Sequence, residues 1–284
     1  MTQDSKIDRI IGLVVGNVAT GISIGWWKSS HNTHHAFTNS VSDDPDIQHE
    51  ILAISDEFWE RDVYSTYHMR LMVRNKITHW CIENQHLLFY PLMLVARFNL
   101  YAQSFLWIWK QRDFAALVEA AALSIHFLGI ACLLLSVPSH KLRLLWVITT
   151  NAAAGILHVQ IALSHFSMPA RHKETEPRLF FLHQIQTSMD IETTWVTDFL
   201  HGGLQFQTTH HLFPRIPRHM LRMAKAEVLK ICSKHEIKYK TVSFIQANRL
   251  LIAKLKHVAL GARRGEKTAV DTCTIITDAL NLRA

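Results

Sequence analysis

The sequence contains few cysteines, and their spacing gives them no common task. Four occur in 284 residues, and no two form a C-x-x-C pair; they are Cys81, Cys132, Cys232 and Cys273. Disulfide frameworks and thiolate zinc modules both need cysteines at short, recurring spacings. The sequence therefore argues against both, and its chemistry must rest on other side chains.

Several common catalytic patterns are absent as well. The sequence has no H-E-x-x-H, G-x-S-x-G or Walker A pattern, and no G-x-G-x-x-G followed by an acidic residue. A dinucleotide-binding fold is therefore not expected, and the chemistries that the other patterns carry have no support. The polar start, Met1 to Asp8, precedes an apolar run without a clear small-residue cleavage site. We therefore expect no secretory signal.

Charge is distributed unevenly along a chain with a net charge of +7. From His211 onward there are 15 lysines and arginines against 5 acidic residues, so the excess of positive charge lies in the last quarter. A basic segment that follows membrane spans is typical of a cytosolic face. Such a segment can also bind nucleic acid, but no nucleic-acid motif accompanies it, so we expect no nucleic-acid partner.

Two long apolar stretches predict a membrane-spanning hairpin. Phe114 to Val137 and Leu144 to Phe166 are each long enough to cross the roughly 30 Å hydrocarbon core of a bilayer. Only Pro138 to Arg143 separates them, so both outer ends must return to the same side of the membrane. The second stretch also carries His158, a polar group of the kind that usually faces a bundle interior or a site.

Two further apolar stretches are less regular. Ile10 to Trp27 is short for a full span and contains pairs of glycines four residues apart, which allow helices to approach closely in lipid. Leu87 to Trp109 has Arg97 near its middle, and an arginine at the centre of a lipid-exposed helix costs at least about 2.5 kcal/mol. We therefore expect this stretch to be an interfacial or buried helix.

After His211 the sequence becomes soluble in character. An amphipathic helix is predicted from about Arg218 and another over Ser243 to Leu260, followed by a loosely structured tail over residues 261–284. Residues 1–260 would then form one membrane domain. The predicted fold is an all-α, multi-span membrane protein with a helical cap that carries a histidine-rich site.

Histidine is the abundant residue type, with 19 copies, and two clusters share one spacing. His31, His34 and His35 stand at i, i+3 and i+4, so on a helix they share one face. The second cluster repeats that spacing as Gln207, His210 and His211. With His165 at the end of the apolar stretch Leu144 to Phe166, these residues predict a metal site, because neutral imidazole suits iron, zinc, copper and nickel.

The alternatives differ from residue to residue. One such cluster could arise by chance in a histidine-rich chain, but two on the same side of a two-span hairpin favour a metal. The remaining histidines are interpreted as surface or packing residues, except that His158 and His201 are candidates for bonding to the ligands. The acidic group Asp43, Asp44 and Asp46 could supply carboxylate ligands, although a turn around its proline that orients the first cluster is the favoured interpretation.

At these residues the sequence resembles the membrane fatty-acyl desaturases, in particular their front-end group. The resemblance is carried by Gly25 to Lys28 leading into His31 to His35, by Asp44 to Gln48, and by Phe199 to Pro214. Gln207, in place of the first histidine of the last histidine cluster, or box, marks the front-end group. The resemblance extends from about Ile10 to Leu260 and is most like the sphingolipid Δ8 desaturases, with the Δ6 and Δ5 acyl desaturases as alternatives.

The resemblance implies a specific chemistry. Members of the family bind two irons through three histidine boxes and one additional histidine, and use O₂ to remove hydrogens from an unactivated methylene pair of a lipid chain. Electrons come from cytochrome b5 and its NADH-dependent reductase. The implied location is the endoplasmic reticulum membrane, with the boxes and the C-terminus cytosolic. The ligands carried over are His31, His34, His35, His165, Gln207, His210 and His211; among them the histidines of the two boxes would carry catalysis through the metals.

The sequence also departs from the family pattern. No histidine precedes His31, so the first box is absent, and there is no H-P-G-G motif of a cytochrome b5 domain. Thr208 and Thr209 stand where Ile-Glu is common. We therefore expect the C-terminal portion of a desaturase that is inactive by itself. The alternatives are a non-catalytic membrane fragment or pseudoenzyme, and a membrane zinc hydrolase for which Glu192 is the weak candidate base.

Overall fold

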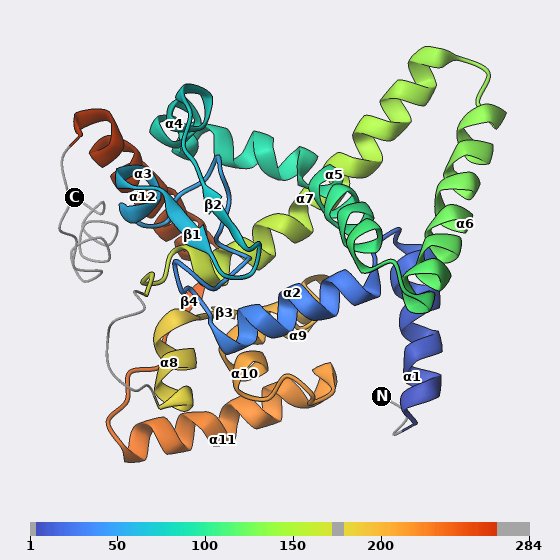
Figure 1. The fold of residues 1–284 in the computed structure, drawn as a ribbon. Helices are drawn as coiled ribbons and strands as arrows, with labels where there is room; N and C mark the ends of the chain where they lie inside the picture. The colour runs from blue at the N-terminus through green and yellow to red at the C-terminus, as the bar shows by residue number, and fades with distance from the viewer. Residues whose placement is uncertain (1–3, 172–178, 266–284) are drawn as a thin grey trace. The chain divides into compact units, whose positions relative to one another are not determined.

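The computed structural model describes residues 4–171 and 179–265, which are mostly helical, as predicted. They divide into two compact units (Figure 1). Unit 1 comprises Met1–Asn32 and Tyr90–His158, and unit 2 comprises Thr33–Phe89 and Val159–Ala284. The unit boundaries fall inside three helices, which are α2 (Ile24–Ala36), α5 (Gln85–Gln111) and α7 (His140–Phe166).

Unit 1 contains the predicted membrane hairpin. Helix α6 (Phe114–Ser136) and helix α7 are long and apolar enough to span a membrane, and a short turn joins them (Figure 1). Asp113 caps α6 by accepting a hydrogen bond from the Ala116 amide at 2.7 Å. This confirms the hairpin that the two long apolar stretches predict, although α7 begins four residues earlier than the expected Leu144.

The first apolar stretch, which the sequence predicts to be short for a full span, is interrupted and does not form one helix. Helix α1 (Ser5–Gly12) continues as a π-helix, η1 (Leu13–Ala19), and the chain then turns by 105° before α2 begins. Gly21 makes the turn with φ +71°, and a Cβ atom there would lie 2.5 Å from the His126 ring. Only glycine fits that backbone conformation in that space without strain. The two helices around the break count as a third span only if they are taken together.

Polar side chains of α5 and α6 bond to this break. Glu119 accepts hydrogen bonds from Ser23 Oγ at 2.5 Å, the Gly25 amide at 3.0 Å and Asn17 Nδ2 at 3.2 Å. Arg97, whose charge argued against a lipid-exposed helix, donates to the Thr20 carbonyl oxygen. The polar residues of these apolar helices thus compensate backbone and side-chain groups that the break leaves without helical partners.

Unit 2 packs short elements around the ends of the long helices. Its two small sheets are an antiparallel pair, β1 with β2, and a parallel pair, β3 with β4. The elements are α3 (Glu57–Glu60), β1 (Val63–Ser65), β2 (Arg70–Met72), α4 (Lys76–Glu83), α8 (Phe180–Thr187), β3 (Asp190–Glu192), α9 (Trp195–His201), η2 (Leu204–Phe206), α10 (Gln207–Leu212), η3 (Arg218–Met220), α11 (Leu221–Lys234), β4 (Thr241–Ser243) and α12 (Phe244–Arg264).

A buried cluster joins α8, α10 and α11. It consists of Ile185, Leu212, Val228 and Cys232, none of them more than 8% exposed. Burying an aliphatic side chain of this size contributes about 1.5–3 kcal/mol, so the cluster fixes the position of the short helix α10. Cys232 therefore belongs to the core, in agreement with the absence of a cysteine motif.

The helix predicted over Ser243 to Leu260 is present and longer than expected. Ser243 caps α12 by accepting a hydrogen bond from the Gln246 amide, and Gly265 ends it in the left-handed conformation with φ +63°. Glycine is the usual residue for that terminating position. Residues 261–264 are thus helical, which corrects the prediction of a loose tail from Gly261, while residues 266–284 lie outside the described part.

Candidate metal centre

Three buried histidines of unit 2 meet at one point. His34, His165 and His211 come from α2, α7 and α10, and each offers a ring nitrogen within 4.8 Å of the nitrogens of the other two. Their ring centroids are 4.6, 4.7 and 4.8 Å apart. Residues separated by up to 177 positions are therefore brought close enough together to coordinate one metal ion.

The local sequence explains the positions of His34 and His211. The first cluster is helical as predicted, so His34 and His35 lie on the last turn of α2. The second cluster starts α10, which is preceded by η2 and, before it, by Gly202 and Gly203, whose φ values are +57° and +96°. A Cβ atom on Gly203 would lie 3.1 Å from Arg218. Two glycines are thus needed to turn the chain from α9 into α10.

Asp44 fixes the orientation of His34. The His34 Nδ1 atom lies 2.9 Å from the buried Asp44 carboxylate, so Nε2 is the nitrogen that His34 would offer a metal. Asp44 also accepts the Asn39 amide at 2.7 Å and the Asp46 amide at 2.9 Å. Although His34, Asp44 and Asp46 also lie close enough for a metal group, both Asp44 oxygens are already bonded. The turn that orients the first cluster, favoured from the sequence, is confirmed.

Gln184 plays the corresponding part for His211. The His211 Nδ1 atom donates to Gln184 Oε1 at 2.9 Å, and Gln184 Nε2 donates to the His35 carbonyl oxygen at 2.8 Å. The Thr38 hydroxyl lies 3.1 Å from the same ring nitrogen. Among the described residues, the buried His211 Nε2 atom has no hydrogen-bond partner. That nitrogen therefore presents its lone pair to the point where the three rings meet.

The third ring is held by backbone and by a side-chain amide. His165 Nδ1 lies 3.4 Å from the Thr187 carbonyl oxygen, and its Nε2 lies 3.2 Å from Gln207 Nε2. Gln207 Oε1 is buried and lacks a partner within the described part of the chain. Gln207 thus contacts the predicted ligand His165, and its buried Oε1 atom is available to coordinate a metal. Both features fit the role that the sequence predicts for Gln207.

Electrostatics keep the α10 histidines in the form that binds metals. Burial lowers the pKa of His210 to about 4, and Arg218 and His34 add to the effect. Burial, followed by the neighbouring histidines, holds the pKa of His211 well below its usual range. Both rings are therefore neutral at physiological pH, and neutral imidazole is the ligand form.

The remaining predicted ligands lie on the same helices. The His35 and His210 rings are 4.7 Å apart, and His35 stacks on His211 at 4.1 Å. His31 lies one turn before His35 on α2 and stacks on Trp27 at 4.8 Å. Unit 2 thus gathers every predicted ligand except His31, which is carried by a helix that continues into it.

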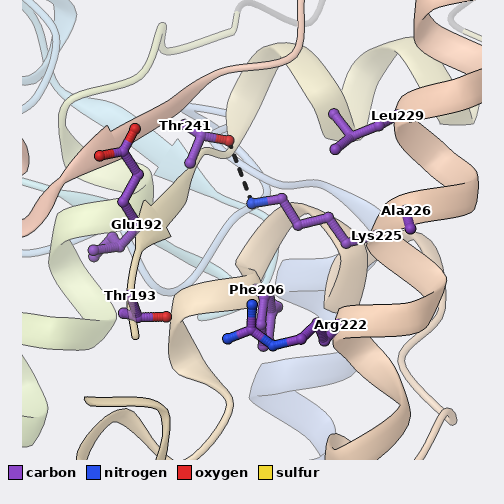
Figure 2. A pocket seen from close by; sticks show the side chains of 9 residues that line it. Glu192, Thr193, Phe206, Arg222, Lys225, Ala226, Leu229 and Thr241 are labelled. Carbon is purple, nitrogen blue, oxygen red and sulfur yellow. Dashed lines mark hydrogen bonds between the residues drawn. The ribbon is translucent and has the colours of Figure 1, made fainter. Parts of the chain in front are cut away.

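Three other predicted residues have different surroundings. In unit 1, His158 Nδ1 bonds to the Met93 carbonyl oxygen at 3.2 Å. In unit 2, the His201 ring packs on Phe244 with centroids 5.7 Å apart. Glu192 is exposed and lines a cavity of about 320 Å³ whose other side chains include Arg222 and Lys225 (Figure 2). Glu192 belongs to none of the possible metal-binding groups of the described residues, so the structure gives no support to a base that acts on metal-bound water.

Sequence reasoning missed most of the groups around the ligands. Thr38, Gln184 and Thr187 belong to no motif, and each reaches its histidine only through the tertiary fold. Thr38 alone carried a weak signal, because it lies four residues after His34, the spacing of one helical turn, although α2 ends at Ala36. Gln184, 27 residues from His211, carried none.

The chain matches the fatty acid desaturase family over residues 3–243 and belongs to that family. It is 39% identical over 269 residues to a Delta 8-(E)-sphingolipid desaturase of Kluyveromyces lactis, an alignment that covers 91% of this chain and 47% of the relative. It is 36% identical to the Delta 8-(E)-sphingolipid desaturase of Emericella nidulans, with 93% and 50% covered, and 35% identical to an acyl-lipid (9-3)-desaturase of Borago officinalis, with 93% and 59% covered. The chain thus spans about half the length of these relatives. No solved structure shows significant similarity.

The donor set fits the iron that family resemblance implies. Imidazole nitrogens bind iron well, and histidine ligands to metals usually donate their second nitrogen to a carboxylate, a carbonyl or water. His34, His165 and His211 each have Nδ1 bonded in this way, to Asp44, Thr187 and Gln184. The three rings are thus held in the way that is usual for histidine ligands, which is compatible with a metal centre.

Proposed function

We propose that this chain is the histidine-rich portion of an O₂-dependent di-iron lipid desaturase. The observation that carries the proposal is the group of His34, His165 and His211, buried and aimed at one point from three helices. Two irons held by the predicted ligands, one of them at this group, would supply O₂ activation and the removal of two hydrogens from a saturated methylene pair, which no side chain can do. The proposed ligands are the predicted ones, with Gln207 among them.

In this proposal the chain's own residues would hold the metals and orient the ligand rings. His34 and His211 would bind metal through Nε2, because Asp44 and Gln184 occupy their Nδ1 atoms. Burial shields both rings from water, and it lowers the pKa of His211 so that this ring is neutral. Fixed ring orientations matter because positioning of the reacting groups is a major source of rate enhancement.

The proposed substrate is the long-chain base of a ceramide-type lipid, desaturated at Δ8. Three of the relatives at 36–39% identity are named as Delta 8-(E)-sphingolipid desaturases, which supports this substrate over others. The alternative is an acyl lipid desaturated by a Δ6 or Δ5 front-end enzyme, which the similarity to the Borago officinalis protein keeps open.

The proposed setting is the endoplasmic reticulum membrane, with the histidine clusters and the basic residues after His211 on the cytosolic side. Cytochrome b5 and its NADH-dependent reductase would supply electrons there. The support is the two-span hairpin, which returns the chain to the side it left, together with the positive-inside tendency.

The orientation is testable in sealed microsomes with a membrane-impermeant maleimide. Ser233→Cys on α11 should be labelled from outside, and His140→Cys at the first residue of α7, next to the hairpin turn, should be labelled only after the vesicles are opened. The unsubstituted chain gives the background of native cysteines. Labelling of both positions from the same side would contradict the topology.

Activity is testable by lipid profiling in a desaturase-null host. One strain expresses the chain alone, and another expresses it joined to the part of the Kluyveromyces lactis relative that it does not match. The joined protein should yield Δ8-unsaturated long-chain bases, and His34→Ala should abolish them. Desaturated acyl groups with unchanged long-chain bases would support the alternative substrate. Absence of any product from a well-expressed protein would favour a non-catalytic role.

A further inference from the structure

A second buried carboxylate lies behind the ligand helix α10. Asp190, at the start of β3, is fully buried, and the backbone pairing of β3 with β4 places it opposite Thr241. Asp190 Oδ1 accepts the Thr208 amide at 3.0 Å, and Oδ2 accepts the Tyr239 hydroxyl at 2.6 Å. The Lys225 ammonium lies 3.0 Å from Oδ2.

These contacts converge on the first turn of α10. Thr208 directly follows Gln207 and precedes His210 and His211, so whatever holds its amide sets the direction in which this six-residue helix leaves η2. The Tyr239 hydroxyl also lies 3.2 Å from Thr209 Oγ1. A carboxylate on a first-turn amide satisfies a donor that the helix cannot satisfy itself and complements the helix dipole.

Lys225 balances the buried charge. It reaches from α11 along the cavity of Figure 2, between the Phe206 ring at 5.7 Å and Thr241 Oγ1 at 3.4 Å. A buried carboxylate without a counter-charge is strongly unfavourable, so the ion pair allows Asp190 to stay charged and bonded to α10. In the described part of the chain the polar contacts of the Asp190 side chain are to Thr208, Tyr239 and Lys225 and not to a histidine ring, so Asp190 would act on a metal only through α10.

We propose that Asp190 is a positioning residue of the metal centre, holding α10 so that His210 and His211 meet the ligands from α2 and α7. The inference rests on the proposed function, because it assumes that these histidines bind metal. It predicts that the hydrogen-bond acceptor at position 190, more than the ion pair, decides how well the site binds.

Two double substitutions separate the acceptor from the charge. Asp190→Asn with Lys225→Met keeps an oxygen for the Thr208 amide, and Asp190→Ala with Lys225→Met removes it. Both lack the ion pair, and neither leaves an unpaired buried charge. The probe is Co²⁺, titrated into the full chain in detergent, with its affinity and its visible absorption as readouts and the thermal unfolding of each metal-free variant recorded alongside.

The alanine double variant should bind Co²⁺ about 10–100-fold more weakly, the range found when outer partners of metal ligands are lost, and its absorption spectrum should change. The asparagine double variant should stay near the parent in both. Asp198→Asn is the matched control, because Asp198 also pairs with an α11 cation, Arg222, but does not bond to α10. It should leave Co²⁺ binding unchanged.

Equal Co²⁺ affinity and equal spectra in the two double variants would overturn the inference, even if the alanine variant melts earlier, because that result describes a purely structural residue. His211→Ala serves as the reference for the site; if it leaves Co²⁺ binding intact, His211 is not a metal ligand and both proposals fail. If binding follows Asp190 and His211 but the chain, joined as above, desaturates no lipid, the proposed function fails and the positioning role stands.

Discussion

The two units use buried polar side chains for different partners. In unit 1, Glu119 and Arg97 bond to groups around a helix break, in segments apolar enough to lie in lipid. In unit 2, Asp44 and Gln184 bond to imidazole nitrogens and leave the other nitrogen of each ring for a metal. Polar groups in unit 1 therefore bond to backbone and side-chain groups that the helix break exposes, whereas those in unit 2 orient histidine rings. Substitutions in unit 1 should change stability, and those in unit 2 should change metal binding.

The largest effect is expected from a ligand itself. His34→Ala removes a buried imidazole from the three-histidine group and should weaken Co²⁺ binding by more than the roughly 10–100-fold cost of losing an outer partner. Isothermal titration of the detergent-solubilised chain measures this. His201→Ala is the control, since that ring packs on Phe244 and should leave binding unchanged. A similar loss in both variants would mean that His201 acts on the site after all.

The next effect separates two neighbouring carboxylates. Asp44→Ala removes the partner of His34 Nδ1 and should weaken Co²⁺ binding by about 10–100-fold. Asp43→Ala is matched in position and chemistry, but Asp43 bonds to the hydroxyls of Ser40, Ser42 and Thr66. It should affect stability and spare metal affinity. Equal affinities for the two variants would refute the orienting role of Asp44.

In unit 1 we expect the opposite result: substitution should lower stability and leave Co²⁺ affinity unchanged. Glu119→Ala leaves the fully buried Asn17 amide and Ser23 hydroxyl without their acceptor, and an unsatisfied buried donor costs about 1–3 kcal/mol. Thermal unfolding in detergent should show the loss, while Co²⁺ affinity measured well below the transition stays that of the parent. Ser124→Ala on the same helix removes only an intrahelical bond to the Ala120 carbonyl and should change little.

Much of the fold and half of the site followed from local sequence patterns. The spacing of His31, His34 and His35 predicts one helical face, and hydropathy predicts the hairpin, because both depend on residues within a few turns of each other. Gln184 and Asp190 could not be found, since their partners His211 and Thr208 are brought to them only by the folded chain. The break in the first apolar stretch was missed for the same reason. Its partner Glu119 lies about ninety residues away in sequence.

The smallest effect concerns the backbone of that break. Gly21→Ala places a Cβ 2.5 Å from the His126 ring on a residue with φ +71°, a conformation that costs an L-residue about 1–2 kcal/mol. Gly129→Ala on α6 is the matched control, because apart from its chain neighbours and the adjoining backbone of α6 no atom of the described residues lies within 4 Å of the added carbon. There the substitution should stabilise by about 0.5–1 kcal/mol, since alanine favours a helix interior over glycine. Unfolding temperatures that move in opposite directions would support a break built into unit 1. A stabilising Gly21→Ala would instead mean that α1, η1 and α2 straighten into one helix. The polar residues of unit 1 would then have no helix break to stabilise, and the contrast between the two units would fail.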